Sequence, residues 1–199
     1  MPLNRKLKKQ ITESFSKVKS SVEVILFVSG KYPRVEREME TALAEILSLN
    51  KKLSFSKYKV NSSIGKKYEL KKGPAIVING KEKGKIRYFG FPSGYLFPVF
   101  VMDIVEASVG GKKAALVKKK THLEVFAMPP DKYSPIAGKI AHDIALASQN
   151  VTADIIDALL FPELVRKYGV KEIPTTIING KKKVPGVVML PKLVKMLKK

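Results

Sequence analysis

The sequence predicts an α/β protein made of two tandem copies of one unit, each a mixed central sheet flanked by helices. Short β-branched apolar runs alternate with segments of helical periodicity along the 199 residues. Residues 74–83 (PAIVINGKEK) align without a gap with residues 174–183 (PTTIINGKKK), at an offset of 100 residues. Both copies follow the order strand, helix, strand, helix, strand, strand, helix, which predicts a parallel βαβ half, an antiparallel hairpin and a closing helix.

The first unit is predicted to span residues 1–109. Apolar residues spaced by three and four predict an amphipathic helix over residues 1–19, which we expect to dock on the following domain; a helix lying on a membrane surface is the alternative. Residues 22–28 (VEVILFV) predict a buried strand. The remaining predicted elements are a helix over 33–49, a strand over 53–60, a turn and short helix over 61–70, strands over 75–78 and 85–89 around the hairpin turn Asn79-Gly80, and a helix over 92–108.

Residues 110–121 predict a basic linker, because two glycines open the segment and five lysines lie within it. The second unit is predicted to span residues 122–199. Its predicted elements are a strand over 123–128, a helix over 134–148, a strand over 151–158, a helix over 161–168 that ends at Gly169, strands over 175–178 and 186–189 around Asn179-Gly180, and a helix over 191–198.

Charge is the unusual feature of the composition, with 38 Lys and Arg against 17 Asp and Glu and a net charge of +21. The excess is divided almost equally between the halves of the chain, +11 up to Val109 and +10 after it. A positive potential of this size attracts polyanions, of which nucleic acid is the most common in a cell. A general adaptation for solubility is the alternative explanation.

The basic residues form clusters, and the clusters that follow the two Asn-Gly pairs are equivalent in the repeat. Lysine suits phosphate contact better than base reading, because arginine makes the bidentate contacts with guanine. We therefore expect binding of weak sequence specificity to RNA or DNA, with ribosomal RNA in a ribonucleoprotein or chromosomal DNA as the target. One cluster alone would indicate only a solvated face. The predicted contacts are Arg5, Lys6, Lys8, Lys9, Lys81, Lys83, Lys112, Lys113, Lys118, Lys119, Lys120, Lys181, Lys182 and Lys183.

Several other classes of function are not indicated. No apolar stretch approaches the roughly 20 residues of a membrane-spanning helix and no signal peptide is visible, so we expect a soluble cytoplasmic protein with no membrane partner. His122 and His142 lie 20 residues apart without convincing carboxylate spacing, so neither a metal site nor a cofactor is expected. The scarcity of Cys and Gln beside abundant Lys is typical of many hyperthermophile proteins.

Two stretches carry a resemblance to a known family. One is RYFGFPSG at residues 87–94, followed by a helix through residues 103–105; the other is Val125-Phe126, followed by residues 135–137 and 141–142. On these motifs the chain resembles the protein disulfide oxidoreductases of hyperthermophilic archaea and some bacteria, which are glutaredoxin-like proteins with two tandem thioredoxin folds. The resemblance covers nearly the whole chain, and it implies two thioredoxin-like units and an archaeal, thermophilic lineage.

The resemblance ends at the redox chemistry. The family carries Cys-x-x-Cys at the start of the first helix of each unit, whereas this chain contains no cysteine. The family pattern places residues 33–36 (Pro33 to Glu36) at the first site and residues 131–134 (Asp131 to Ser134) at the second. Thiol exchange requires an attacking thiolate and a partner sulfur, which the Ser134 hydroxyl cannot replace. We therefore expect a redox-inactive protein that is not an enzyme.

Pro74 and Pro174 match the family's cis-proline, beside which the backbone is able to pair with an extended peptide; a purely structural role is the alternative. This match implies a second possible function, a protein–protein scaffold that uses the vestigial groove near Pro33, Pro74, Ser134 and Pro174. A noncatalytic enzyme subunit is a third possibility.

Overall fold

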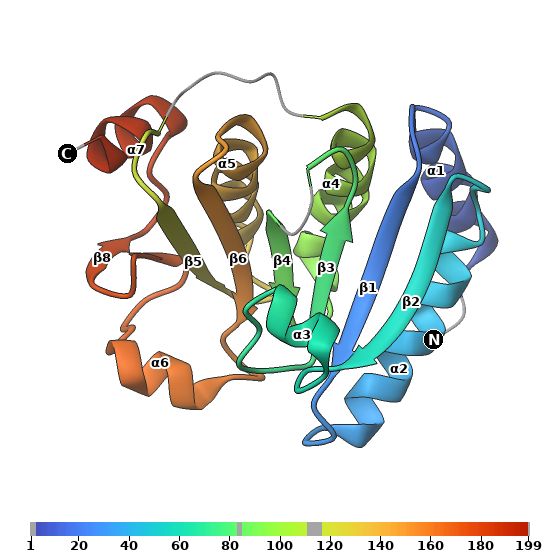
Figure 1. Cartoon of the computed structure of the whole chain (residues 1–199), viewed down its shortest axis with the longest axis horizontal. Coiled ribbons are helices and arrows are strands. Elements are labelled where there is room, and N and C mark those ends of the chain that lie inside the picture. The colour runs from blue at the N-terminus through green and yellow to red at the C-terminus, as the bar shows by residue number, and fades with distance from the viewer. Residues whose placement is uncertain (1–2, 83–84, 111–116, 199) are drawn as a thin grey trace. The chain divides into compact units, whose positions relative to one another are not determined.

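A computed structural model of the chain describes residues 3–82, 85–110 and 117–198 (Figure 1). Residue contacts divide these into two compact units. The first contains the residues up to 82 together with 101–110, and the second contains 85–100 and the residues from 117 onward. Among the described residues, no helix has the length and apolar character that crossing a bilayer requires.

The sheet of the first unit has β1 (Val22–Val28) at its centre, parallel to β2 (Leu53–Lys59) and antiparallel to β3 (Ala75–Asn79). All five residues of β3 are buried, as a strand in the middle of a core requires. In Figure 1, α2 (Pro33–Leu47) lies behind β1 and β2, and α3 (Ser63–Lys67) lies on the near side.

The N-terminal helix α1 (Arg5–Phe15) begins at Asn4, whose side chain accepts a hydrogen bond from the Leu7 amide at 2.8 Å. Its apolar stripe buries Ile11 and Phe15 completely or nearly so. The Phe15 carbonyl accepts a hydrogen bond from Asn50 at 2.8 Å. The helix therefore docks on its own unit, as the sequence favoured over a membrane surface.

The sheet of the second unit has the order β4 (Ile86–Phe89), β6 (Val151–Asp157), β5 (Thr121–Ala127), β7 (Thr175–Ile178) and β8 (Lys182–Pro185). The first three strands are parallel, and β7 and β8 add an antiparallel hairpin. Helix α5 (Ser134–Ala147) packs on β5 and β6, behind them in Figure 1. The other helices are α6 (Pro162–Tyr168), α7 (Leu190–Leu197), and α4 (Phe97–Val109), which follows the 3-10 turn η1 (Gly94–Leu96) and ends within the first unit.

The predicted fold class, a mixed sheet flanked by helices in each of two units, is confirmed. The unit boundaries differ from those suggested by the repeat, because residues 85–100 group with the second unit through the parallel pairing of β4 with β6. Most of the predicted linker, residues 111–116, lies outside the described residues. The predicted helix over 92–108 begins later, at Phe97, after η1.

The predicted strand over 186–189 is wrong, because β8 begins at Lys182. Asn179 and Gly180 both have left-handed φ values, 53° and 67°, so the chain reverses at once and the Lys181 amide donates to the Ile178 carbonyl. Of the four residues of β8 only Val184 is buried, so this edge strand carries no apolar signal.

The first Asn-Gly pair serves a different purpose from the second. Asn79 is the last residue of β3 and does not have a positive φ, so it does not form the predicted tight turn. Gly80 lies so close to α4 that an added Cβ would stand 2.0 Å from the Ala107 carbonyl oxygen. Glycine is therefore required there for close backbone approach, whereas at Gly180 it is required for turn geometry.

This difference predicts unequal costs for the same substitution. Gly80→Ala forces the chain away from α4 and is expected to destabilise the protein by about 3 kcal/mol, the upper range for overpacking. Gly180→Ala adds only left-handed strain, about 1 kcal/mol, because the nearest atom to the added Cβ would be the Tyr168 hydroxyl oxygen at an ordinary contact distance of 3.8 Å. Urea denaturation followed by circular dichroism measures both, and equal losses would show that contact with α4 is not what demands glycine.

Candidate functional site

The first redox-equivalent position is occupied by a buried carboxylate. Pro33 begins α2, and Glu36, one turn further along the helix, is only 6% exposed. Glu36 Oε1 accepts hydrogen bonds from the Ser29 amide and hydroxyl, both at 2.8 Å, and from the Gly30 amide at 3.0 Å. The first turn of a helix favours a negative charge. Glu36 therefore fastens the loop between β1 and α2.

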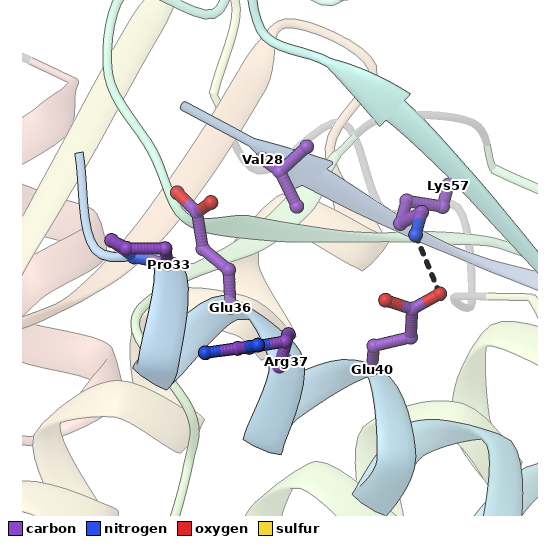
Figure 2. A pocket seen from close by; sticks show the side chains of 6 residues that line it. All are labelled: Val28, Pro33, Glu36, Arg37, Glu40 and Lys57. Atoms are coloured by element: carbon purple, nitrogen blue, oxygen red, sulfur yellow. Dashed lines mark hydrogen bonds and ion pairs between the residues drawn. The ribbon is translucent and has the colours of Figure 1, made fainter. Parts of the chain in front are cut away.

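Beside this position lies a pocket of about 340 Å³, lined by Val28, Pro33, Glu36, Arg37, Glu40 and Lys57. Figure 2 shows the side chains of α2 facing Lys57 of β2 across it. The Lys57 ammonium lies 2.6 Å from Glu40 Oε1. Both carboxylates of the lining therefore accept hydrogen bonds from neighbouring groups of the first unit.

The second redox-equivalent position is also used for internal bonding. Ser134 is fully buried, and its amide and hydroxyl donate to Asp131 Oδ2 at 2.6 and 2.7 Å. The same hydroxyl oxygen accepts a hydrogen bond from the Met128 amide at 3.1 Å. Glu36 therefore accepts hydrogen bonds from two amides of the loop after β1, and Ser134 accepts one from the loop after β5.

The peptide bonds before Pro74 and Pro174 are both cis, and both prolines are buried. In the first unit this loop packs against the redox-equivalent site, since a Cβ added to Gly73 would stand 3.4 Å from the Ser29 Cβ. The structure thus brings Pro74 close to the loop that Glu36 holds. In the second unit the Pro174 carbonyl accepts a hydrogen bond from the Gly186 amide at 2.8 Å.

The predicted phosphate contacts are distributed over both units and do not form one described cluster. Lys8 is half-buried and forms an ion pair with Glu45 at 2.8 Å, which lowers the pKa of that carboxyl. Lys83, Lys112 and Lys113 lie outside the described residues. The remaining predicted contacts are exposed: Arg5, Lys6, Lys9, Lys81, Lys118, Lys119, Lys120, Lys181, Lys182 and Lys183.

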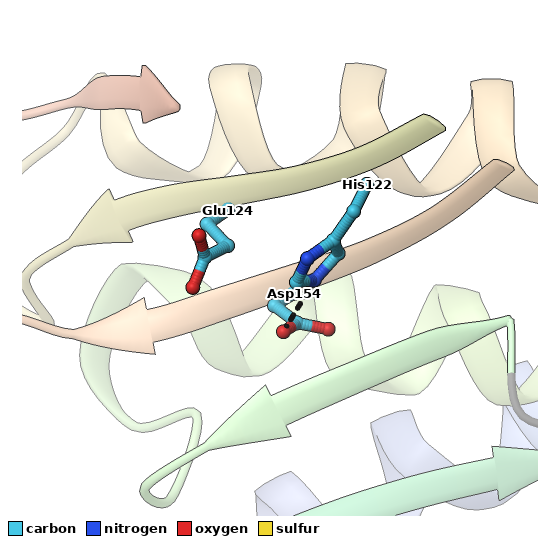
Figure 3. A group of neighbouring side chains, drawn as sticks. All are labelled: His122, Glu124 and Asp154. Atoms are coloured by element: carbon cyan, nitrogen blue, oxygen red, sulfur yellow. Dashed lines mark hydrogen bonds and ion pairs between the residues drawn. The ribbon is translucent and has the colours of Figure 1, made fainter. Parts of the chain in front are cut away.

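A buried ionic cluster in the second unit was not predicted from the sequence. The strand register aligns Arg87 of β4 with Asp154 of β6 and Glu124 of β5, so three charged residues stand side by side across the sheet. Arg87 binds Asp154 through two hydrogen bonds, Nε to Oδ1 at 2.6 Å and Nη2 to Oδ2 at 3.0 Å. His122, two residues before Glu124 on the same face, places Nε2 2.8 Å from Asp154 Oδ2 (Figure 3).

The charges of this cluster perturb the acidity of its members. Burial acts to raise the pKa of Asp154, but Arg87 and His122 outweigh burial and hold that pKa well below its ordinary value. Tyr168 of α6 donates its hydroxyl to Glu124 at 2.8 Å. Burial, together with this hydrogen bond, raises the pKa of Tyr168 to about 12. Glu124 is thereby held by a neutral donor although it lies beside a second carboxylate.

His122, Glu124 and Asp154 also gather potential metal ligands, since one ligand atom from each lies within 4.8 Å of the others. However, the Arg87 guanidinium already holds both oxygens of Asp154, so it occupies the place of the positive charge that a metal ion would supply. The donor set therefore fits a closed ion network better than a metal centre. The sequence analysis found no carboxylate at a convincing spacing from either histidine and did not predict this group. Asp154 lies on β6, whereas His122 and Glu124 lie on β5, so the three residues meet only through the pairing of the two strands.

Asp154→Asn is expected to destabilise the protein by about 3–5 kcal/mol at pH 7, because it leaves Arg87 buried without its counter-charge. Because the pKa of Asp154 is lowered in the folded protein, its contribution to the free energy of unfolding is complete above the ordinary carboxyl pKa of about 4 and is lost as pH falls below that value. Urea denaturation between pH 3 and 7 should therefore show that the free energy of unfolding falls less steeply with acid in the variant than in the unmodified protein. Asp143→Asn, at a half-exposed ion pair with Lys139, is the control and should cost under about 1 kcal/mol.

The double substitution Asp131→Cys with Ser134→Cys tests whether the loop before α5 has the geometry of a Cys-x-x-Cys site. Ser134 is the first residue of α5, where the helix dipole lowers the pKa of a thiol, and Asp131 lies three residues before it. We expect a reversible intramolecular disulfide, measured by thiol titration in glutathione buffers, with the single variant Ser134→Cys as control. Failure of the two thiols to pair under oxidising buffer would show that the loop has lost that geometry.

Comparison with known proteins agrees with this description of the fold. Residues 132–198 match the thioredoxin domain family. A search of curated proteins gave no match. The chain is similar to a protein disulfide oxidoreductase from Aeropyrum pernix (TM-score 0.87, 22% identity, covering 100% of this chain and 93% of that one). It is also similar to the NTD_N/C domain of the alkylhydroperoxide reductase AhpF from Enterococcus faecalis, with a TM-score of 0.86 and 22% identity over 98% of this chain and 100% of that one. A third similar structure is Sso1120 from Sulfolobus solfataricus, with a TM-score of 0.67 and 17% identity over 90% of this chain and 99% of that one. The chain therefore has a thioredoxin-like fold.

Proposed function

We propose that this chain is a redox-inactive relative of the archaeal protein disulfide oxidoreductases, and that it binds RNA or DNA through contacts with the phosphate backbone. The observation that carries the proposal is the net charge of +21, borne by lysines that are exposed in both units. The absence of cysteine supports it, because Glu36 and Ser134, which the family pattern places at the redox sites, form hydrogen bonds to their loops.

The positive charge is concentrated in parts of the chain. Residues 86–110 and 121–165 contain three basic and eight acidic side chains, and the rest of the chain contains 35 basic and nine acidic ones. In the second unit, Lys192 and Lys195 lie on the exposed face of α7, and the exposed Lys198 follows its last residue. The exposed lysines of the β7–β8 hairpin precede them in the same unit. Such concentrations neutralise phosphates more effectively than evenly mixed charges.

The scarcity of arginine supports binding of weak sequence specificity. Only five of the 38 basic residues are arginine, and one of these, Arg87, is buried against Asp154. Lysine ammonium groups contact phosphate as point charges and lack the planar fork that reads guanine. The ligand we propose is therefore a nucleic acid recognised by its backbone.

A scaffold that binds an extended protein segment is the second candidate. Its support is the retention of a cis-proline loop in each unit, packed in the first unit against the loop at Ser29. This function predicts binding that depends on the groove residues and survives nuclease treatment.

Nucleic-acid binding is tested by mobility shift with a 30-nucleotide RNA and a 30-base-pair DNA at two salt concentrations. If about six phosphates are neutralised, affinity should fall ~10³-fold between 50 and 200 mM NaCl. Lys181→Ala with Lys182→Ala should reduce the salt slope by about 2, whereas Lys132→Ala, an exposed lysine within residues 121–165, should leave it unchanged. Absence of binding to both probes at 50 mM NaCl would refute the proposal.

A further inference from the structure

The two copies of the repeat share basic residues as well as core residues. The alignment of residues 74–83 with 174–183 extends back without a gap to residues 66 and 166. Five of the aligned positions are basic in both copies. The pairs are Lys66 and Arg166, Lys67 and Lys167, Lys71 and Lys171, Lys81 and Lys181, and Lys83 and Lys183.

The short helix that carries the first two pairs ends with the same geometry in both units. Glu69 and Gly169, which follow the last turn of α3 and α6, both have a left-handed φ of 55°. The Leu70 amide donates to the Gly65 carbonyl at 3.1 Å, and the equivalent hydrogen bond 100 residues later measures 2.9 Å. The first two basic pairs therefore lie in equivalent last turns, and the third pair lies just beyond an equivalent reversal of the chain.

A tyrosine places each of these helix ends beside the Asn-Gly pair. Tyr68 and Tyr168 each pack edge-on against a phenylalanine of β1 or β5, with ring centroids 5.7 Å apart in both units. In the first unit, Asn79 donates a hydrogen bond to the Tyr68 hydroxyl oxygen at 2.5 Å. In the second unit, a Cβ added to Gly180 would stand 3.8 Å from the Tyr168 hydroxyl oxygen. Each unit therefore brings the end of its short helix close to the lysines that follow Asn-Gly.

Backbone contacts fix these lysines. The Lys183 ammonium donates to the Gly169 carbonyl at the end of α6. In the first unit, the Lys81 amide donates to the Ala107 carbonyl of α4 at 3.0 Å. Each unit therefore has a basic surface built from the short helix and the Asn-Gly segment, which we call its short-helix surface. Its described residues are Lys66, Lys67, Lys71 and Lys81 in the first unit, and Arg166, Lys167, Lys171, Lys181 and Lys183 in the second.

Packing does not require basic residues at these positions. All of the described ones are exposed, and none of them forms an ion pair with a carboxylate of the described chain. The negative end of a helix dipole favours basic residues in its last turn, which accounts for the first two pairs but not for the three that follow. Residues 66–72 with 79–83 contain six basic and two acidic side chains, and residues 166–172 with 179–183 contain six and one.

We propose that each unit binds the phosphate backbone of a nucleic acid through its short-helix surface, so that one chain carries two equivalent phosphate-binding sites. This inference rests on the proposed function and assigns it to particular residues. Neither the short-helix lysines of the first unit nor Arg166, Lys167 and Lys171 of the second are among the contacts predicted from the sequence. A duplex of 30 base pairs, ~100 Å long, offers phosphates to both surfaces.

Fluorescence anisotropy of the full chain with the 30-nucleotide RNA and the 30-base-pair DNA, between 50 and 200 mM NaCl, tests the inference. Lys67→Ala with Lys71→Ala removes two charges from the first surface, and Lys167→Ala with Lys171→Ala removes the equivalent two from the second. Each double variant should reduce the slope of log affinity against log salt by about 2, and all four substitutions together by about 4. Circular dichroism should be unchanged, because the four side chains are exposed.

Arg37→Ala with Lys132→Ala is the matched control. It also removes two exposed positive charges, one from each unit, but outside both surfaces. Arg37 belongs to α2, which lies behind the sheet in Figure 1, whereas α3 lies on the near side. This control should leave the slope unchanged.

The outcomes separate this inference from the proposed function. Binding by the unmodified chain with a slope that neither surface variant changes more than the control does would overturn the inference and leave the proposed function standing. A reduced slope in only one of the two surface variants would overturn the equivalence of the sites, and the inference with it. Absence of binding by the unmodified chain to both probes at 50 mM NaCl would refute the proposed function itself, and this inference as a consequence.

Discussion

The ion pair between Arg87 and Asp154 is the constraint around which the second unit is organised. It joins β4 to β6 through two short hydrogen bonds, and the register continues from Asp154 to Glu124 on β5. Two neighbouring carboxylates in a buried sheet would repel each other, so the guanidinium, His122 and the Tyr168 hydroxyl are needed to balance them. The parallel alignment of these three strands in turn sets where their carboxyl ends, and the loops that follow, come together.

The loops that follow β1 and β5 are each fastened by a side chain from the helix that comes next. Glu36 is the fourth residue of α2 and Ser134 is the first residue of α5. Glu36 accepts hydrogen bonds from two amides of the preceding loop, and Ser134 accepts one. A buried amide without a partner is costly, so a carboxylate or hydroxyl that satisfies these groups stabilises the loop. The same positions cannot also supply an attacking thiolate. In the first unit the loop at Pro74 packs against the loop at Ser29 that Glu36 holds.

The sequence by itself determined the elements, the repeat and the absence of thiol chemistry, because these depend on local periodicity and on residue types such as cysteine that are either present or absent. Most strands and helices could be predicted in this way, including the buried β3 and the helix α5. The tertiary structure alone decided that Asn79-Gly80 and Asn179-Gly180 differ, that β8 begins at Lys182, and that Arg87, His122, Glu124 and Asp154 meet. Each of these outcomes depends on strand register or on close approach between segments far apart in the sequence, which local patterns do not encode.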